Sequence, residues 1–72
     1  MIRFDPPALF KALDAQRAAR SLSWRDVSQE TGVNASTLMR TREQGRFEVD
    51  GVLAMAGWLG RPIEDFTRRT SF

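Results

Sequence analysis

The chain contains no cysteine, no histidine and no tyrosine. Without cysteine it forms no disulfide, and without cysteine or histidine it lacks the usual ligands of zinc. The same absences remove the thiol nucleophile and the commonest general base of enzymes. Glu64 and Asp65 are neighbours, so on a helix they diverge by about 100° and make no carboxylate pair. We therefore expect no catalytic residue, no metal and no cofactor.

Long apolar runs are also absent. No stretch approaches the roughly 18 apolar residues of a membrane-spanning helix, and the start MIRFDPPALF lacks the features of a signal peptide. A chain of 72 residues supports one domain with a small core and has no room for a separate ligand-sensing domain. The sequence predicts a single soluble, cytoplasmic domain over residues 1–72, with no membrane partner and no small-molecule ligand.

Three stretches of the chain carry the same signal for the start of a helix. Asp5, Ser23 and Asn34 occupy the N-cap position, and each is preceded by an apolar residue that can pack against another five positions later. Ser23 is also followed by Asp26, which completes a capping box. The predicted helices span residues 6–20, 24–31 and 35–43.

The second half of the chain predicts two further helices. Apolar residues at helical spacing form one stripe, which Gly60 ends as a left-handed C-cap; Glu48 or Asp50 caps its start. Pro62 then opens a short last helix, and residues 67–72 are expected to be a frayed tail. The sequence thus predicts an all-α, five-helix fold. The predicted core comprises Leu9, Leu13, Leu22, Val27, Val33, Leu38, Val49, Val52, Leu53, Leu59, Ile63 and Phe66.

The second and third helices are joined by a tight turn, Thr31-Gly32-Val33-Asn34, which predicts a helix-turn-helix at about residues 23–43. With Leu38 facing the core, Ser36 and Arg40 point outward, about 160° and 200° away. Small residues at 34–37 would let the backbone approach the major groove closely. Arg40, one turn further along, can reach guanine O6 and N7 with two hydrogen bonds.

Most of the chain resembles the lambda-repressor/Cro-like (Xre-type) helix-turn-helix regulators of bacteria and phages. The resemblance rests on Leu22-Ser23 with Val27, on Thr31-Gly32-Val33-Asn34-x-Ser36-Thr37-Leu38-x-Arg40, on Gly45, and on the spacing of apolar residues from Val49 to Phe66. It implies a lambda-repressor-like domain that binds double-stranded operator DNA, commonly as a two-fold dimer. The contacts it implies are to bases from Ala35, Ser36 and Arg40, and to phosphates from Ser23, Trp24, Asn34, Thr37 and the loop around Arg46.

Trp24 departs from the family pattern, whereas Arg17 matches it and is expected to form an ion pair. Trp24 stands where many members have a glutamine that braces a phosphate; it keeps one N–H donor but is bulkier. Arg17 matches a position that often pairs with an acidic residue of the third helix, and Glu43 is the expected partner.

Several aromatic and basic residues allow two interpretations. Trp24 and Phe47 either cover the core or lie near DNA, and for Phe47 we expect the first. Trp58 either covers the first or last helix or forms the centre of a dimer interface. Arg46 clamps a phosphate or is merely solvated. The pair Arg68-Arg69 is expected to be a solvated end rather than a second DNA contact.

The predicted function is sequence-specific binding of double-stranded DNA by a small, repressor-like transcriptional regulator. The net charge of +2 is modest for this class. A helix-turn-helix that binds another protein, as an antitoxin or adaptor does, is therefore the alternative.

Overall fold

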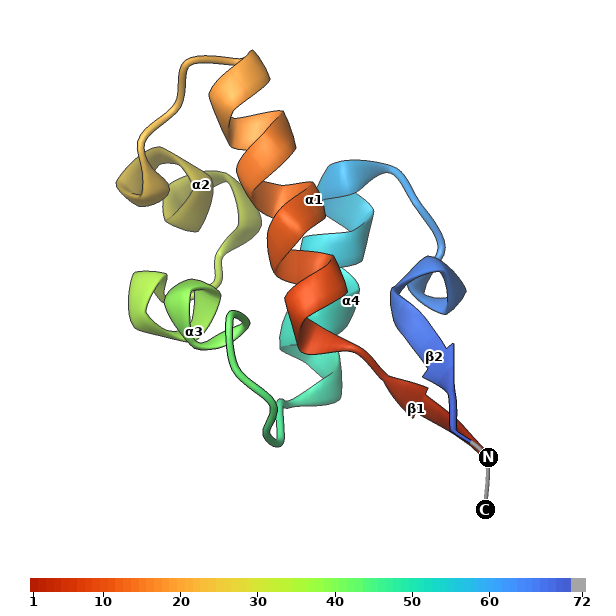
Figure 1. The fold of residues 1–72 in the computed structure, drawn as a ribbon. Helices are drawn as coiled ribbons and strands as arrows, with labels where there is room; N and C mark the ends of the chain where they lie inside the picture. The colour runs from red at the N-terminus through yellow and green to blue at the C-terminus, as the bar shows by residue number, and fades with distance from the viewer. Residues whose placement is uncertain (71–72) are drawn as a thin grey trace.

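The computed structural model describes residues 1–70, which fold into four α-helices, one 3₁₀ helix and a two-stranded sheet (Figure 1). The predicted all-α, five-helix fold is wrong on two counts. The last predicted helix is a short 3₁₀ turn, and residues near both ends of the chain form strands. The elements in order are β1 (Ile2–Phe4), α1 (Pro6–Ala19), α2 (Trp24–Thr31), α3 (Ala35–Arg40), α4 (Val49–Leu59), η1 (Ile63–Phe66) and β2 (Thr67–Arg69).

The first three α-helices begin at the predicted caps. The Asp5 carboxylate accepts a hydrogen bond from the Ala8 N–H, and the Asn34 side chain accepts one from the Ser36 N–H. Ser23 and Asp26 form the complete capping box at the start of α2. Each cap satisfies a backbone donor that would otherwise have no partner in the helix, so these local contacts fix where the chain enters each helix.

The turn between α2 and α3 is held by side chains as well as by glycine. Gly32 takes a left-handed conformation with φ of 76° and ends α2. The Ser28 hydroxyl donates to the Val33 carbonyl at 2.6 Å, and the Val33 N–H donates to the Thr31 hydroxyl at 3.1 Å. Val33 itself is buried in the core. These contacts fix the angle between the two helices.

Replacing Gly32 with alanine should lower the free energy of unfolding by about 1–2 kcal/mol, because a Cβ is strained in the left-handed region. A Cβ at Gly32 meets no atom within 4 Å, so the backbone alone carries this cost. Gly45→Ala is the matched control, since that site is equally open and Gly45 is not among the positive-φ residues. Urea unfolding of both variants measures the difference; equal stabilities would contradict the role of the turn.

The core lies between the four α-helices, each of which contributes buried apolar residues, and η1 closes it. The buried apolar residues are Leu9, Leu13, Val27, Val33, Leu38, Val52, Met55, Ala56 and Phe66. The predicted face of α4 is partly wrong, because Val49 is 67% exposed and Leu53 is 50% exposed. Val52, Met55, Ala56 and Leu59 form the inward stripe, and Leu53 lies about 100° from Val52 around the helix.

Helix α3 is shorter than predicted, since it ends at Arg40 rather than near residue 43. Thr41 follows it and is fully buried. Its hydroxyl donates to the Leu38 carbonyl at 2.6 Å, so the buried polar group is satisfied by the last turn of the helix. The chain then leaves the helical path and continues as a loop to Glu48.

The two ends of the described chain pair as an antiparallel ribbon. Ile2 lies opposite Arg69, Arg3 opposite Arg68 and Phe4 opposite Thr67. The prediction of a frayed tail is therefore wrong for residues 67–69; residues 71–72 lie outside the described residues. The Asp5 N–H also donates to the Phe66 carbonyl at 2.7 Å, which fastens the ribbon to the start of α1.

None of the described helices combines the length and apolar character needed to cross a membrane.

Candidate nucleic-acid interface

The start of α3 presents small polar groups to solvent. Asn34 and Ser36 are exposed, while Ala35 is half-buried. The Asn34 side-chain oxygen accepts from the Ser36 N–H at 2.9 Å and from the Ser36 hydroxyl at 2.7 Å. With its proton directed to Asn34, the Ser36 hydroxyl is left as an acceptor, which suits an exocyclic amino group of a base. The Asn34 side-chain N–H₂ stays free to donate to a phosphate.

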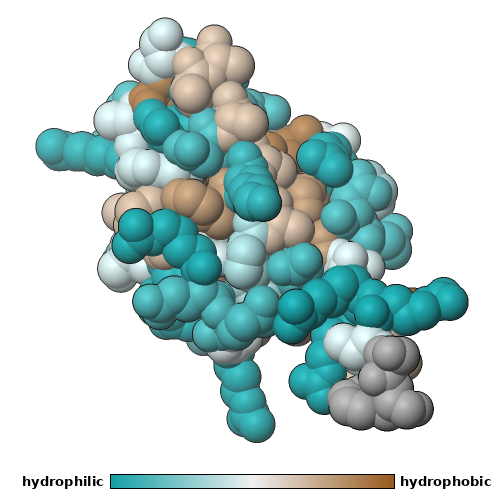
Figure 2. All heavy atoms as spheres, viewed as in Figure 1, coloured by the Kyte–Doolittle hydropathy of each residue, from teal (hydrophilic) through white to brown (hydrophobic). Residues whose placement is uncertain are grey.

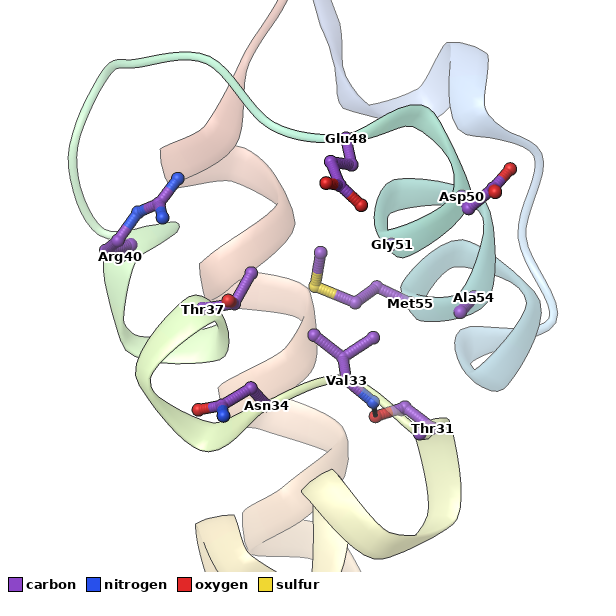
Figure 3. A pocket seen from close by; sticks show the side chains of 11 residues that line it. Thr31, Val33, Asn34, Thr37, Arg40, Glu48, Asp50, Gly51, Ala54 and Met55 are labelled. Carbon is purple, nitrogen blue, oxygen red and sulfur yellow. Dashed lines mark hydrogen bonds between the residues drawn. The ribbon is translucent and has the colours of Figure 1, made fainter.

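Thr37 does not lie with Ser36 on the outward face. It is half-buried and lines a groove of about 460 Å³ between the α2–α3 turn and the start of α4. Figure 3 shows Thr37 and Glu48 directed toward Met55, whereas Asn34 points away from the groove. We call this hollow the α3–α4 groove. Its lining residues are Thr31, Gly32, Val33, Asn34, Thr37, Arg40, Glu48, Asp50, Gly51, Ala54 and Met55.

Arg40 is exposed at the end of α3, but its guanidinium is held by the following loop. One Nη donates to the Arg46 carbonyl at 2.9 Å, and the guanidinium carbon lies 5.0 Å from the centre of the Phe47 ring. Phe47 in turn meets Phe4 of β1 edge-on, with ring centres 5.9 Å apart. Phe47 thus covers the edge of the core, as expected from the sequence, and it also supports Arg40, which the sequence did not reveal.

The start of α2 has fewer free donors than its cap residue suggests. The Ser23 N–H donates to the Asp26 carboxylate at 2.9 Å, and the Ser23 hydroxyl accepts from the Asp26 N–H. The hydrogen bond from the Ser23 N–H to the carboxylate, followed by the effect of the Ser23 hydroxyl on that carboxylate, holds the pKa of Asp26 below its ordinary value. Asp26 therefore stays charged at neutral pH, and a phosphate at this end would contact the Ser23 hydroxyl while facing that carboxylate.

Trp24 is half-buried against α1. Its ring stacks on Phe10 with centres 5.4 Å apart, and the Arg17 guanidinium lies over it at 5.1 Å. The expected Arg17–Glu43 pair is wrong. Arg17 pairs with Asp14 at 2.7 Å and donates to the Leu22 carbonyl, because residues three apart on α1 are nearer than the loop after α3.

Trp58 joins α4 to the first two helices. Its indole N–H donates to the Glu30 carboxylate at 2.9 Å, and Arg20 both lies over the ring and pairs with Glu30. The indole hydrogen bond, followed by Arg20, holds the pKa of Glu30 below its ordinary value. The interactions of the Glu30 carboxylate with Trp58 and Arg20 therefore stabilise the fold fully at pH values above the ordinary pKa of glutamate. This stabilisation is lost as the pH falls through the lowered pKa.

Arginines without a carboxylate partner are the main electrostatic feature of the surface. Among the described residues, the ion pairs engage Arg17, Arg20 and Arg61. Arg40, Arg42 and Arg46 lie on the last turn of α3 and in the loop, all exposed and outside these pairs. We call these three residues the arginine face. Figure 2 shows mainly hydrophilic residues along the lower side of the molecule, where Figure 1 places α3, the loop and the ribbon.

Comparisons of the chain with family models, with curated proteins and with solved structures find no match. Similarity therefore assigns the chain to no family, and its function must be inferred from its own residues.

Proposed function

We propose that the chain binds double-stranded DNA, with the start of α3 in the major groove, and acts as a small transcriptional regulator of the lambda-repressor-like type. The proposal rests on a helix that begins with small exposed polar residues and ends at a group of three arginines, none of which pairs with a carboxylate of residues 1–70. Because the side chains of the first turn are small, the backbone of α3 can approach base edges closely. The planar guanidinium groups of the arginines can bind both guanine and phosphate.

The proposed roles follow from the exposure and hydrogen bonding of each side chain. Ser36 accepts from a base amino group, Ala35 offers its methyl group to a thymine, and Arg40 donates to guanine. Asn34, Ser23 and Arg46 bind phosphates. Thr37 and Trp24 contribute less to phosphate binding than expected from the sequence. Thr37 faces the α3–α4 groove, and the Trp24 ring is stacked on Phe10 of α1. A regulator of this kind works in the cytoplasm. Trp58 is half-buried and hydrogen-bonded to Glu30, so only its exposed part could contribute to a dimer interface.

Binding of another protein is the second candidate, and the α3–α4 groove favours it. Its floor includes Val33 and Met55, and its rim carries the carboxylates of Glu48 and Asp50. This lining fits a basic side chain with an apolar stem better than it fits a phosphate. The carboxylates also confine any DNA contact to the opposite, α3 edge of the groove.

An NMR titration of labelled protein with a mixed-sequence duplex separates the two functions. At low salt, amide signals of residues 34–40 and of the loop should shift, and at about 0.3 M salt they should return. For three to five phosphate contacts the affinity should fall roughly 40- to 500-fold between 50 and 200 mM salt, through counterion release. No shift with DNA would overturn the proposal. Shifts confined to Glu48–Met55 on adding a basic peptide would support the protein-binding alternative instead.

A further inference from the structure

The β1–β2 ribbon carries a pair of like charges that the fold itself does not need. Arg3 lies directly opposite Arg68, so both side chains project from the same face of the ribbon. Both are exposed; Arg69, the next residue of β2, is exposed too, but it lies opposite Ile2 and projects from the other face. Like charges directly opposite each other destabilise an antiparallel pair, and a two-stranded ribbon is marginal by itself.

No carboxylate in the described chain forms an ion pair with these arginines. Of the acidic residues nearest along the chain, Asp5 caps α1, and Asp65 pairs with Arg61 at 3.0 Å. Glu64 precedes β2 on η1 and forms no ion pair with another residue of the described part of the chain. The ribbon is thus a cationic surface whose repulsion an anion from outside would relieve. Two adjacent guanidinium forks match the oxygens of a phosphodiester.

The ribbon is joined directly to the proposed DNA-binding face. Phe4, the last residue of β1, contacts Phe47, which supports Arg40 from the other side. Figure 1 shows α3, the loop and the ribbon in succession along one side of the molecule. The longest dimension of the chain is 40 Å, close to the roughly 34 Å of one duplex turn. One turn of duplex is therefore about as long as the molecule and can span the distance from α3 to the ribbon.

We propose that Arg3 and Arg68 form a second phosphate-binding site that holds the backbone of the duplex read by α3. This inference rests on the proposed DNA binding and extends it to an element outside the helix-turn-helix. A second copy of the chain is a poor occupant of this face of the ribbon, because it would bring the same two positive charges. The site adds affinity for every DNA sequence and takes no part in base preference.

The test measures how duplex affinity depends on salt in four forms of the protein. These are the wild type, Arg68→Gln, Arg3→Gln/Arg68→Gln, and Lys11→Gln as the control. Lys11 is also exposed and outside the ion pairs, but it lies on α1. The slope of log affinity against log salt should become shallower by about 0.9 for each phosphate that the variant no longer neutralises. It should change little in Lys11→Gln.

Thermal unfolding is the second measurement, because it distinguishes a phosphate-binding role of Arg3 and Arg68 from a role in stabilising the fold. Because the two charges repel each other, the unfolding temperature of Arg3→Gln/Arg68→Gln should be equal to that of the wild type or higher. Its duplex affinity should fall several-fold. A lower unfolding temperature would show that the arginines support the fold, and would overturn the inference. An equally shallow slope in Lys11→Gln would overturn it too, because net charge alone would then explain the effect.

The remaining outcomes separate this inference from the proposed function. If the wild type binds no duplex at low salt, both fail. If Arg40→Ala weakens binding and the ribbon variants do not, DNA binding stands and the ribbon site is wrong. If the ribbon variants keep duplex affinity but lose binding to poly-glutamate, the ribbon recognises carboxylates of an acidic protein, and the phosphate site is likewise wrong.

Discussion

Phe66→Ala should lower the free energy of unfolding by about 3–5 kcal/mol, most of the stability expected of so small a domain. The Phe66 side chain is 1% exposed and belongs to the central core. Its helix, η1, contacts both α1 and α4, and the Phe66 carbonyl accepts from the Asp5 N–H. Losing the ring would leave a cavity where three segments meet. It would also loosen the junction from which the ribbon extends.

Urea unfolding followed by circular dichroism measures this loss, and two variants frame it. Val49→Ala changes an apolar residue that is 67% exposed and should alter stability by no more than about 0.5 kcal/mol. Phe66→Leu keeps part of the apolar volume and should recover part of the loss, which also gives a value if Phe66→Ala does not fold. A loss below about 1 kcal/mol in Phe66→Ala would mean that η1 is not part of the core.

The starts of the first three helices and the ends of α2 and α4 could be predicted because their signals are local, whereas the end of α3 was predicted about three residues too late. Asp5, Ser23 and Asn34 cap the helices that the sequence predicts them to cap. Gly32 and Gly60 both take the left-handed conformation expected at the ends of α2 and α4. In each case the energy lies between residues a few positions apart, so the sequence of a short stretch contains all the information.

The ribbon could not be predicted, since its energy lies between segments at opposite ends of the chain. Residues 2–4 and 67–69 are too short to show alternation, and three of the six paired positions hold arginine rather than a residue typical of strands. The prediction of the buried face of α4 was partly wrong for a different reason. Val49 and Leu53 fit a helical stripe as well as Met55 does, and only the placement of α1 decides which of them is buried.

The candidate site was predicted as a set of residue types but not as a set of contacts. The small residues at 34–37 and the basic residues after them are properties of the sequence. That Arg40 is held by the loop, and that Thr37 faces the α3–α4 groove, depends on how the chain returns from Thr41 to Glu48. Ser21 was also missed: it takes a left-handed conformation with φ of 55° after α1, where glycine is usual.

Arg40→Ala should weaken binding to a preferred duplex by about 1–3 kcal/mol, or roughly 5- to 150-fold, and relax the preference at one base pair. The contact to the Arg46 carbonyl does not prevent base reading. It uses one donor of a guanidinium that has five, so the remaining edge can present two N–H groups to guanine O6 and N7. The Phe47 ring keeps the group near that position before DNA arrives, which reduces the entropy lost on binding.

Two further variants separate the charge of Arg40 from its geometry. Arg40→Lys keeps the charge but loses the planar fork, so it should retain the salt dependence while losing much of the base preference. Phe47→Leu keeps Arg40 and removes the ring beneath it, so both affinity and preference should fall by a smaller factor. Fluorescence anisotropy with a preferred duplex and with single-base variants of it measures all three. If Arg40→Ala preserves both affinity and preference, α3 does not read DNA through Arg40. If Arg40→Lys behaves as the wild type, Arg40 binds phosphate as a simple charge and base preference must come from Ser36 and Ala35.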